Sequence, residues 1–373
     1  MQKKVVLIAG VVGGVLIAAG ITLFAMQGKV AAGHFEKAQQ IAASGNPAEV
    51  IAILEKVNIK RLKGEDRLEA LVLLGKSHTT LGNKQKARKM WERILATPDA
   101  GKAFTDVARF NLALLNQETN PQESQTAFAE LAQSSQDSEV ASGSLLEIAK
   151  TQAAAGDMLA ARESFKKVID HFPGCSRMNQ AVAGLSDANT RLLFSKIETP
   201  YSAVHVVKSG ESLALIAQKY NMTVELLMES NGLKSDAIRK GDRLKVCTAT
   251  FSILVDKSQN TLTLKANEEL FKIYLVGTGK EGSTPIGEFQ ITNKLPEPTW
   301  FHPQGGVIPF GSKENLLGTR WIGINSPGYG IHGTWEPDSV GKQSSAGCIR
   351  LVNEQVEELY KIVTVATPVT IVE

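Results

Sequence analysis

The most informative shortage in this sequence is that of cysteine. Only three occur among 373 residues, Cys175, Cys247 and Cys348, so they cannot all pair with one another. In a compartment where disulfides persist, at least one remains a free thiol and a candidate reactant. An excess of charge is also lacking, because lysine and arginine outnumber aspartate and glutamate by only three. Neither nucleic acid nor an acidic surface is therefore expected as a partner.

Residues 5–26 carry no charge at all, and an apolar run of this length can cross a hydrocarbon core of about 30 Å. We expect an uncleaved transmembrane signal anchor here, with the rest of the chain outside the cytoplasm. Lys3 and Lys4 precede the run and favour a cytoplasmic N-terminus. A cleaved secretory signal is the alternative, but it would have a shorter apolar core, and Val30-Ala31-Ala32 is a poor cleavage site.

The segment 33–195 predicts an all-α array of helical repeats. It is rich in helix-forming residues, with apolar positions at helical spacing. Gly45, Gly82 and Gly156 are separated by 37 and then twice 37 residues. The same period holds for the large apolar residues Leu54, Trp91, Phe128 and Phe165, for Val57, Ile94, Leu131 and Val168, and for the small residues Ala87, Ser124 and Ala161.

This pattern resembles tetratricopeptide repeats, three residues longer than their usual period, in about four copies. Such arrays bind partner segments or act as spacers, so a protein partner on the repeats is expected. Stacking of the helices explains the repeated aromatic residues, and no ligand is assigned to them.

Residues 196–203, which include Pro200, break the helical pattern and form the expected linker. The stretch 204–247 then predicts a small βααβ module. Ser212 and Thr223 are placed to cap two short helices, and Asn231-Gly232 ends the second. Together with V-x-x-G-E-S-L at the start and G-D-x-L near the end, this stretch resembles the LysM family.

The LysM resemblance implies binding of N-acetylglucosamine-containing glycans such as peptidoglycan. The family groove lies between the first strand-to-helix turn and the loop after the second helix. The residues carried over from that groove are Gly210, Glu211, Ser212, Asn231, Gly232, Leu233 and Lys234. For each of them, a role in a turn or a cap competes with ligand contact.

The segment 250–373 predicts a β-rich domain. FSILVD and TLTLKA flank Ser258-Gln259-Asn260 as a hairpin, and LFKIYLVG continues it with Phe271, Ile273 and Leu275 on one face and Lys272 and Tyr274 on the other. Further strands are expected at GEFQIT, TRWIGIN and PVTIV, and a helix at 354–363 capped by Asn353.

His332 and Cys348 lie 16 residues apart in a stretch rich in turn formers. An imidazole beside the sulfur would take its proton, leave a thiolate and an imidazolium, and later return the proton to a leaving amine. The N–H groups of Gly347 and Cys348 are candidates to stabilise an oxyanion. Arg350 alternates with Cys348 and is expected on the same side of the strand. No neighbouring Cys or His completes a metal-ligand set, so no metal and no cofactor are expected.

H-G-T followed by S-x-G-C-I-R resembles the L,D-transpeptidases of the YkuD type. The resemblance continues upstream through T-P-I-G-E-F and N-L-L-G. It implies a cysteine acyl transfer on peptidoglycan stem peptides, in which a stem tetrapeptide loses its terminal D-Ala and an acceptor amine resolves the thioester. Many members carry a His directly before the Gly-Cys pair, where this sequence has Ala346.

Each residue of the expected site has an implied role. Cys348 is the nucleophile and His332 the general base and acid; Gly347, Ser345 and Gly333 serve the oxyanion or the orientation of the loop; Arg350, Tyr329 and Thr334 contact substrate. Trp321 is interpreted as a core residue.

The resulting expectation is a single-pass protein of a bacterial cell membrane whose body faces the periplasm or cell wall. The alternatives are a non-catalytic scaffold bound to the cell wall and an L,D-carboxypeptidase that uses water as acceptor. A cysteine endopeptidase fits less well, because the common family of those enzymes places its Cys before its His.

Overall fold

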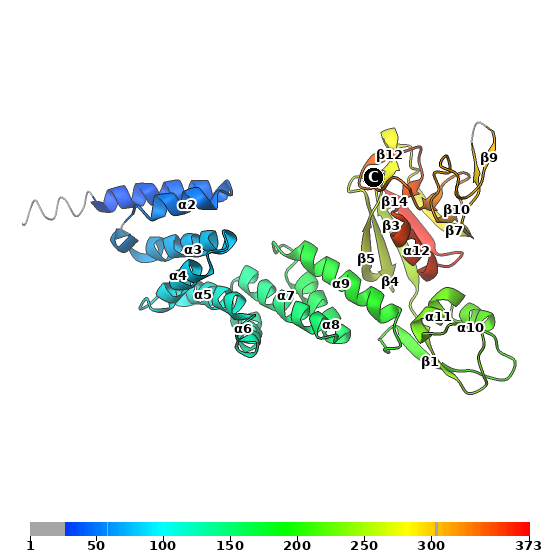
Figure 1. Ribbon diagram of the computed structural model, residues 1–373, viewed down its shortest axis with the longest axis horizontal. Helices are drawn as coiled ribbons and strands as arrows, with labels where there is room; N and C mark the ends of the chain where they lie inside the picture. The colour runs from blue at the N-terminus through cyan, green and yellow to red at the C-terminus, as the bar shows by residue number, and fades with distance from the viewer. Residues whose placement is uncertain (1–26, 58, 303–304) are drawn as a thin grey trace, which may run out of the picture. The chain divides into compact units, whose positions relative to one another are not determined.

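A computed structural model describes residues 27–57, 59–302 and 305–373 (Figure 1). The chain divides into two compact units, and the division falls after Ile148, within helix α7 (Ser138–Ala154). The structure contradicts the predicted single-pass membrane protein. Over the three described ranges, no helix has the length and apolar character that a membrane crossing requires. The expected span, residues 5–26, lies outside the described residues.

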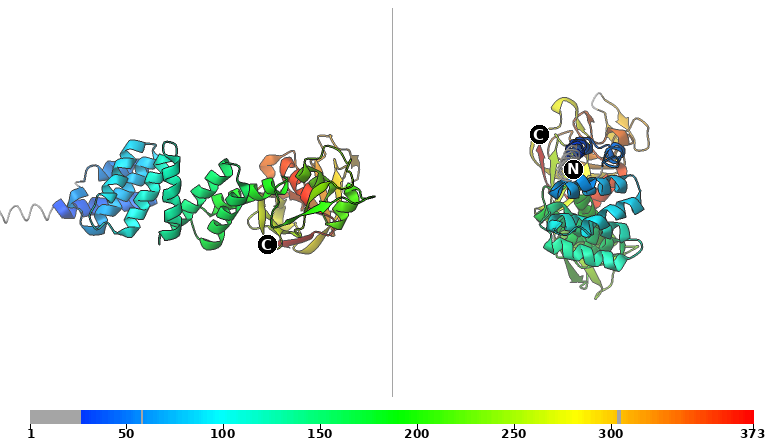
Figure 2. Two further views of the ribbon diagram at one scale, coloured as in Figure 1. Left: turned by 90° about the horizontal axis from the view of Figure 1, so that it is seen from below. Right: turned by 90° about the vertical axis from the view of Figure 1, so that its left-hand side faces the viewer.

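The first unit consists of helical hairpins, which Figure 2 shows from two directions. Residues 27–43 are helical. They are followed by α2 (Pro47–Leu54), the 3₁₀ turn η1 (Ile59–Arg61), α3 (Gly64–Thr80), α4 (Lys84–Leu95), α5 (Gly101–Asn116) and α6 (Pro121–Ser134). The 37-residue period predicted the core correctly, because Leu54, Trp91 and Phe128 are fully buried. The small residues on the same period, Ala87, Ser124 and Ala161, are buried as well. Gly75 also lies close to the core, since a Cβ on it would be 2.5 Å from the Trp91 ring.

The second unit begins with a helix pair, α8 (Met158–His171) and α9 (Met178–Leu193). The small module follows as β1 (Ser202–Val206), α10 (Leu213–Lys219), α11 (Val224–Asn231) and β2 (Arg243–Cys247). Its caps are the predicted ones. Ser212 accepts a hydrogen bond from the Leu215 N–H, Thr223 accepts one from the Leu226 N–H, and Gly232 ends α11 in the left-handed conformation.

The remaining residues form a β-rich domain around one eight-stranded sheet. Its spatial order is β13 (Ile349–Arg350), β11 (Gly330–His332), β10 (Arg320–Ile324), β7 (Gly287–Pro296), β14 (Pro368–Val372), β3 (Phe251–Asp256), β4 (Thr261–Ala266) and β5 (Glu269–Leu275). Short pairs join β12 (Gln343–Ser345) to β6 (Thr278–Gly279) and β8 (Trp300–Phe301) to β9 (Val307–Ile308). Two 3₁₀ turns, η2 (Lys280–Gly282) and η3 (Pro337–Ser339), lie in the loops.

Helix α12 (Asn353–Ile362) lies against β10 and β11, near one end of the sheet. Its Glu358 also binds Lys272 and Tyr274 of β5, at the other end. Strands in a sheet are about 4.8 Å apart, so β5 and β11 would be nearly 30 Å from each other in a flat sheet. The sheet must therefore curve around α12.

The faces of β5 differ from those predicted. Tyr274 is fully buried, whereas Ile273 and Leu275 are exposed. A bulge between Leu264 and Lys265 shifts the register of the β4–β5 pair and places Tyr274 opposite Leu262 of the core. The buried hydroxyl of Tyr274 donates to Glu358, 2.6 Å away. A tyrosine can be buried when its hydroxyl has a hydrogen-bond partner, and an alternating pattern of apolar and polar residues does not predict this.

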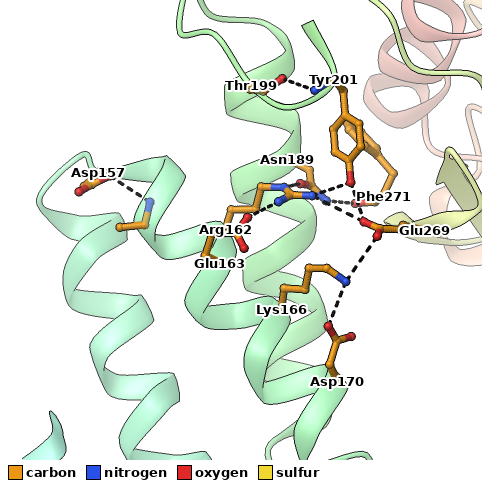
Figure 3. A network of polar contacts seen from close by, with 11 residues as sticks. Asp157, Arg162, Glu163, Lys166, Asp170, Asn189, Thr199, Tyr201, Glu269 and Phe271 are labelled. Carbon is orange, nitrogen blue, oxygen red and sulfur yellow. Dashed lines mark hydrogen bonds and ion pairs between the residues drawn. The ribbon is translucent and has the colours of Figure 1, made fainter.

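Helix α9 packs against the edge strand β5, and a network of polar contacts around the buried Arg162 joins the two (Figure 3). The Arg162 guanidinium of α8 donates to Asn189 of α9 at 2.8 Å and to the Tyr201 hydroxyl of the linker at 2.9 Å. Tyr201 in turn donates to Glu269 of β5 at 2.6 Å. One apolar core also runs from the end of α9 through the small module into the sheet. The last helix pair is thus built into the second unit.

Candidate active site

The sheet brings the His332 and Cys348 segments together. Strands β11 and β13 are parallel neighbours, and their register pairs Ile331 with Ile349 and His332 with Arg350. Paired residues of adjacent strands project to the same face, so His332 and Arg350 share one face. Cys348 directly precedes β13, and its Sγ lies 3.5 Å from the Gly328 carbonyl, in the turn that leads into β11. The chain between them doubles back through η3 and β12.

The protonated nitrogen of His332 is fixed by a backbone carbonyl. Nδ1 lies 2.6 Å from the carbonyl oxygen of Gly333. A carbonyl can only accept, so Nδ1 carries the proton and donates it. In the neutral ring, Nε2 is then the nitrogen with the free lone pair, which suits it to act as a base.

Burial shifts the pKa values of both His332 and Cys348 in the direction that favours their neutral forms. His332 is only 3 % exposed, and this burial lowers the pKa of its imidazole to about 4, despite opposing contacts with the backbone of Gly333 and Leu317. Burial likewise raises the pKa of the Cys348 thiol, against smaller lowering effects of the Gly330 backbone and the Arg350 charge. Both shifts favour a thiol and a neutral imidazole at rest over a thiolate and an imidazolium.

The loop before Cys348 is held by the hydroxyl of Ser345. This oxygen accepts the Gly347 N–H at 3.0 Å and donates to the Cys348 carbonyl at 2.6 Å. The Gly347 N–H, one of the two expected oxyanion donors, is therefore already engaged. The Cys348 N–H donates to no acceptor within the part of the chain that the structure describes.

Gly347 has two reasons to be glycine. Its φ of +133° lies in a region that side chains avoid. A Cβ at this position would also lie 2.6 Å from Cε1 of Tyr329. The Tyr329 ring thus lies directly against the backbone of the catalytic loop.

Gly333 is held on both sides. Its N–H donates to the Arg320 carbonyl at 3.1 Å, and a Cβ would lie 2.2 Å from Oδ1 of Asn353. Asn353 was predicted to cap α12, but it lies inside the helix and its Oδ1 accepts the Thr319 N–H at 3.1 Å. The side chain that was assigned to the helix end instead supports the turn after His332.

The expected substrate contacts lie around this centre. The side chain of Arg350 is 12 % exposed, and one of its terminal nitrogens lies 3.8 Å from a carboxylate oxygen of Glu336. Thr334 is buried and its hydroxyl accepts the Glu336 N–H at 3.0 Å. Thr334 therefore shapes the turn that presents Glu336 to Arg350.

Two further neighbours of the site are Trp321, which the sequence placed in the core rather than on the wall of a substrate groove, and Thr284, to which it gave no role. Trp321 pairs with His332 across β10 and β11, and the two rings stack with centroids 5.9 Å apart. Thr284 is buried, and its hydroxyl donates to the Gly347 carbonyl at 2.8 Å. The only signal for Thr284 was its place in T-P-I-G, and strand alternation alone could not reveal the cross-strand stack.

In the small module, most of the expected glycan-contacting residues make internal bonds. Glu211 accepts from the Lys208 N–H at 2.7 Å and contacts His205 at 2.8 Å. Gly210 has a φ of +82°, as its turn requires. Asn231 is buried, and its side-chain amide bonds to both the N–H and the carbonyl of Lys245. Lys234 is exposed and Leu233 is half-buried.

Three family matches cover the second unit and part of the first. Residues 250–371 match the L,D-transpeptidase catalytic domain called YkuD, 205–246 match the LysM domain, and 69–100 and 144–174 match the tetratricopeptide repeat. The predicted resemblances are confirmed, as are the helical N-terminal region and the β-rich C-terminal domain.

Individual proteins show the same likeness. YkuD of Bacillus licheniformis, whose name assigns it provisionally to the L,D-transpeptidases, is 36% identical over 176 residues, which cover 45% of this chain and 98% of that protein. LytE of Bacillus subtilis, provisionally named a peptidoglycan endopeptidase, is 52% identical over 44 residues, or 12% of this chain and 13% of LytE. An L,D-transpeptidase structure from Mycobacterium smegmatis is 21% identical over 36% of this chain and 64% of that one, with a TM-score of 0.29.

Proposed function

Because this chain belongs to the L,D-transpeptidase family, we propose that it cross-links peptidoglycan stem peptides with Cys348 as the nucleophile. The observation that carries the proposal is the Nδ1–H bond from His332 to Gly333, which leaves Nε2 as a base on the strand next to Cys348. A neutral thiol and a neutral imidazole are the correct starting forms for transfer of one proton from sulfur to nitrogen.

In the first half-reaction, Nε2 of His332 takes the thiol proton as Sγ of Cys348 attacks the carbonyl of the third residue of a donor tetrapeptide. The negative charge moves to the carbonyl oxygen, and the Cys348 N–H is the candidate donor to it. The tetrahedral intermediate then collapses with cleavage of the bond to D-Ala. His332 returns its proton to the departing amine, and a thioester remains on Cys348.

In the second half-reaction, an amine of another stem peptide attacks the thioester and gives up a proton to Nε2. The carbon–sulfur bond breaks, and the sulfur recovers that proton as a thiol. Water in place of the amine makes the same centre an L,D-carboxypeptidase. Gly333, Ser345 and Gly347 hold the geometry, and Arg350, Tyr329 and Thr334 line the approach to it.

We further propose that the LysM module holds the glycan strand that bears these stem peptides. Its proposed contacts are Gly210, Glu211, Ser212, Asn231, Gly232, Leu233 and Lys234. A modest affinity suffices, because a tether raises the local concentration of stem peptides on the same polymer. The shared core of the second unit supports this role, since it holds the module at a set place beside the catalytic domain.

The test uses the purified chain and a disaccharide-tetrapeptide. We expect release of D-Ala and formation of a cross-linked dimer, both measured by mass spectrometry. Cys348→Ala abolishes both products, and Cys175→Ala, which alters a buried free thiol outside the site, leaves them unchanged. Turnover by Cys348→Ala at the wild-type rate would remove the nucleophile assignment. Release of D-Ala without any dimer would identify water as the acceptor.

A further inference from the structure

The hydroxyl of Thr284 connects two loops beneath the catalytic cysteine. Thr284 is 1 % exposed. Its Oγ1 accepts the Gly279 N–H at 2.8 Å and donates to the Gly347 carbonyl at 2.8 Å. A buried hydroxyl that both accepts and donates at normal distances has one defined orientation.

The loop that contains Gly279 and Thr284 packs tightly against the loop that contains Gly347, so the hydrogen bond between Thr284 and Gly347 is held in one geometry. A Cβ on Gly279 would lie 2.8 Å from the Cα of Gly347 and 2.7 Å from the Thr284 nitrogen. Strands β6 and β12 pair beside them, with Ser345 opposite Gly279. The carbonyl of Gly347 is therefore fixed by a rigid neighbour.

The Gly347 carbonyl and the Cys348 N–H belong to one peptide group. That group is planar and trans, as are all peptide bonds in the described residues. In a trans peptide the N–H points opposite to the carbonyl. Because Thr284 fixes the direction of the carbonyl, it also fixes the direction of the Cys348 N–H, which points away from Thr284.

The neighbouring donor cannot take over this task. The Gly347 N–H already donates to Ser345 at 3.0 Å. The Cys348 N–H is left without an acceptor among the described residues, at the position directly attached to the nucleophile. An oriented, unpaired N–H at that place is what a developing oxyanion requires.

We propose that Thr284 is a positioning residue that orients the Cys348 N–H toward the oxyanion formed during acyl transfer. This inference rests on the proposed acyl transfer to Cys348 and adds a residue to it. Thr284 contacts neither the sulfur nor the substrate. It acts on the step in which the sulfur–carbon bond forms and the carbonyl oxygen becomes negative, and it leaves the ionisation of the thiol unchanged.

This division of roles defines the experiment. Thr284→Val removes the hydroxyl and keeps the shape, and Thr284→Ser keeps the hydroxyl. Thr292→Val is the matched control, because the Thr292 hydroxyl also donates to a backbone carbonyl, that of Gly323, but lies outside the catalytic loop. Two reactions of Cys348 are measured for each full-length variant. Acylation by p-nitrophenyl acetate forms an oxyanion, whereas alkylation by iodoacetamide forms none. The rate of the Cys348→Ala variant is subtracted from both.

Loss of a single oxyanion donor lowers kcat by about 100- to 1000-fold in well-studied enzymes, and a misdirected donor loses part of that effect. We expect Thr284→Val to slow acylation by roughly 10- to 100-fold, with KM and the alkylation rate within about twofold of wild type. Thr284→Ser restores most of the acylation rate, and Thr292→Val acylates like wild type.

Three results would overturn the inference: acylation by Thr284→Val at the wild-type rate, an equal fall of acylation and alkylation, or failure of Thr284→Ser to recover. An equal fall would show that the hydroxyl merely holds the loop together. The proposed function is judged separately by D-Ala release. A wild-type chain that is acylated on Cys348 but releases no D-Ala refutes the substrate assignment, and the Thr284 comparison still decides the inference.

Discussion

The imidazole of His332 stacks on the indole of Trp321, with ring centroids 5.9 Å apart and planes inclined by 21°. The side chain of His332 is only 3 % exposed, and its burial lowers the pKa of the imidazole to about 4. The low pKa favours the neutral ring and leads to predictions about stability and reactivity.

The first prediction concerns stability at acid pH. The pKa of His332 falls from 6.5 in the unfolded chain to about 4 in the folded one. Between these values only the unfolded state binds the proton, so stability decreases as pH falls from about 6.5 to 4, by up to about 3 kcal/mol. We expect denaturant titrations at several pH values to show that His332→Asn weakens this dependence. The prediction is contradicted if the free energies of unfolding of the wild type and of His332→Asn change equally with pH between about 6.5 and 4.

The second prediction concerns the pH dependence of Cys348 alkylation. Burial raises the pKa of its thiol above the ordinary value, and alkylation requires the thiolate. The rate of reaction with iodoacetamide should therefore keep rising with pH through 9. Cys348→Ala gives the background of the other two thiols. A plateau that begins near pH 5 would instead reveal a preformed thiolate and imidazolium, against the burial seen here.

The third prediction concerns the Arg162 network. Arg162→Met leaves the buried Asn189 side-chain oxygen without its donor and removes one of the two hydrogen bonds of the half-buried Tyr201 hydroxyl. An unsatisfied buried group costs about 1–3 kcal/mol, so we expect the free energy of unfolding to fall by about 2 kcal/mol.

Its control is Arg191→Met. Arg191 forms an exposed pair with Asp187 on the same helix pair, and such pairs contribute at most about 1 kcal/mol. Urea titration followed by tryptophan fluorescence measures both variants. Equal effects of the two substitutions would show that the network does not join the helix pair to β5.

The fourth prediction separates structure from binding in the LysM module. Asn231→Ala removes the amide that pairs with the N–H and carbonyl of Lys245. We expect it to lower the free energy of unfolding by about 2–4 kcal/mol. Lys234→Ala, at an exposed position, leaves stability unchanged and weakens sedimentation with purified peptidoglycan. Full sedimentation of Lys234→Ala would remove that residue from the proposed glycan contacts.

The fifth prediction concerns Gly347. A methyl group at this position collides with the Tyr329 ring and meets an unfavourable φ of +133°. We expect Gly347→Ala to lower D-Ala release by about 100-fold, because the displaced Cys348 no longer reaches its attack position, while the protein stays folded. Tyr329→Ala removes the ring with which the new methyl group collides. Combining it with Gly347→Ala therefore tests whether this collision causes the loss of activity. If Gly347→Ala alone released D-Ala at the wild-type rate, the loop before Cys348 would be shown to accommodate the methyl group without loss of activity.

Much of the fold was predictable because local patterns carry it. The caps at Ser212 and Thr223 and the β3–β4 hairpin each follow from a few neighbouring residues. The 37-residue period can be read directly from the order of apolar residues along the chain. The prediction for β5 failed, because Phe271 is an extra residue in the β4–β5 pairing and this bulge in β5 changed which residues after it face the core. Asn353 fits a helix cap in sequence, yet a distant N–H at Thr319 engages it.

The sequence by itself determined the modules, their order and the candidate site residues, since apolar periodicity, turn formers and motif spacing can be read along the chain without any knowledge of its contacts. Only the tertiary structure decided the burial that shifts the pKa values of His332 and Cys348, the engagement of the Gly347 N–H and the two hydrogen bonds of the Thr284 hydroxyl. Burial and hydrogen-bond direction depend on segments that are far apart in the chain, and these quantities exist only once the sheet has curved and the loops have packed.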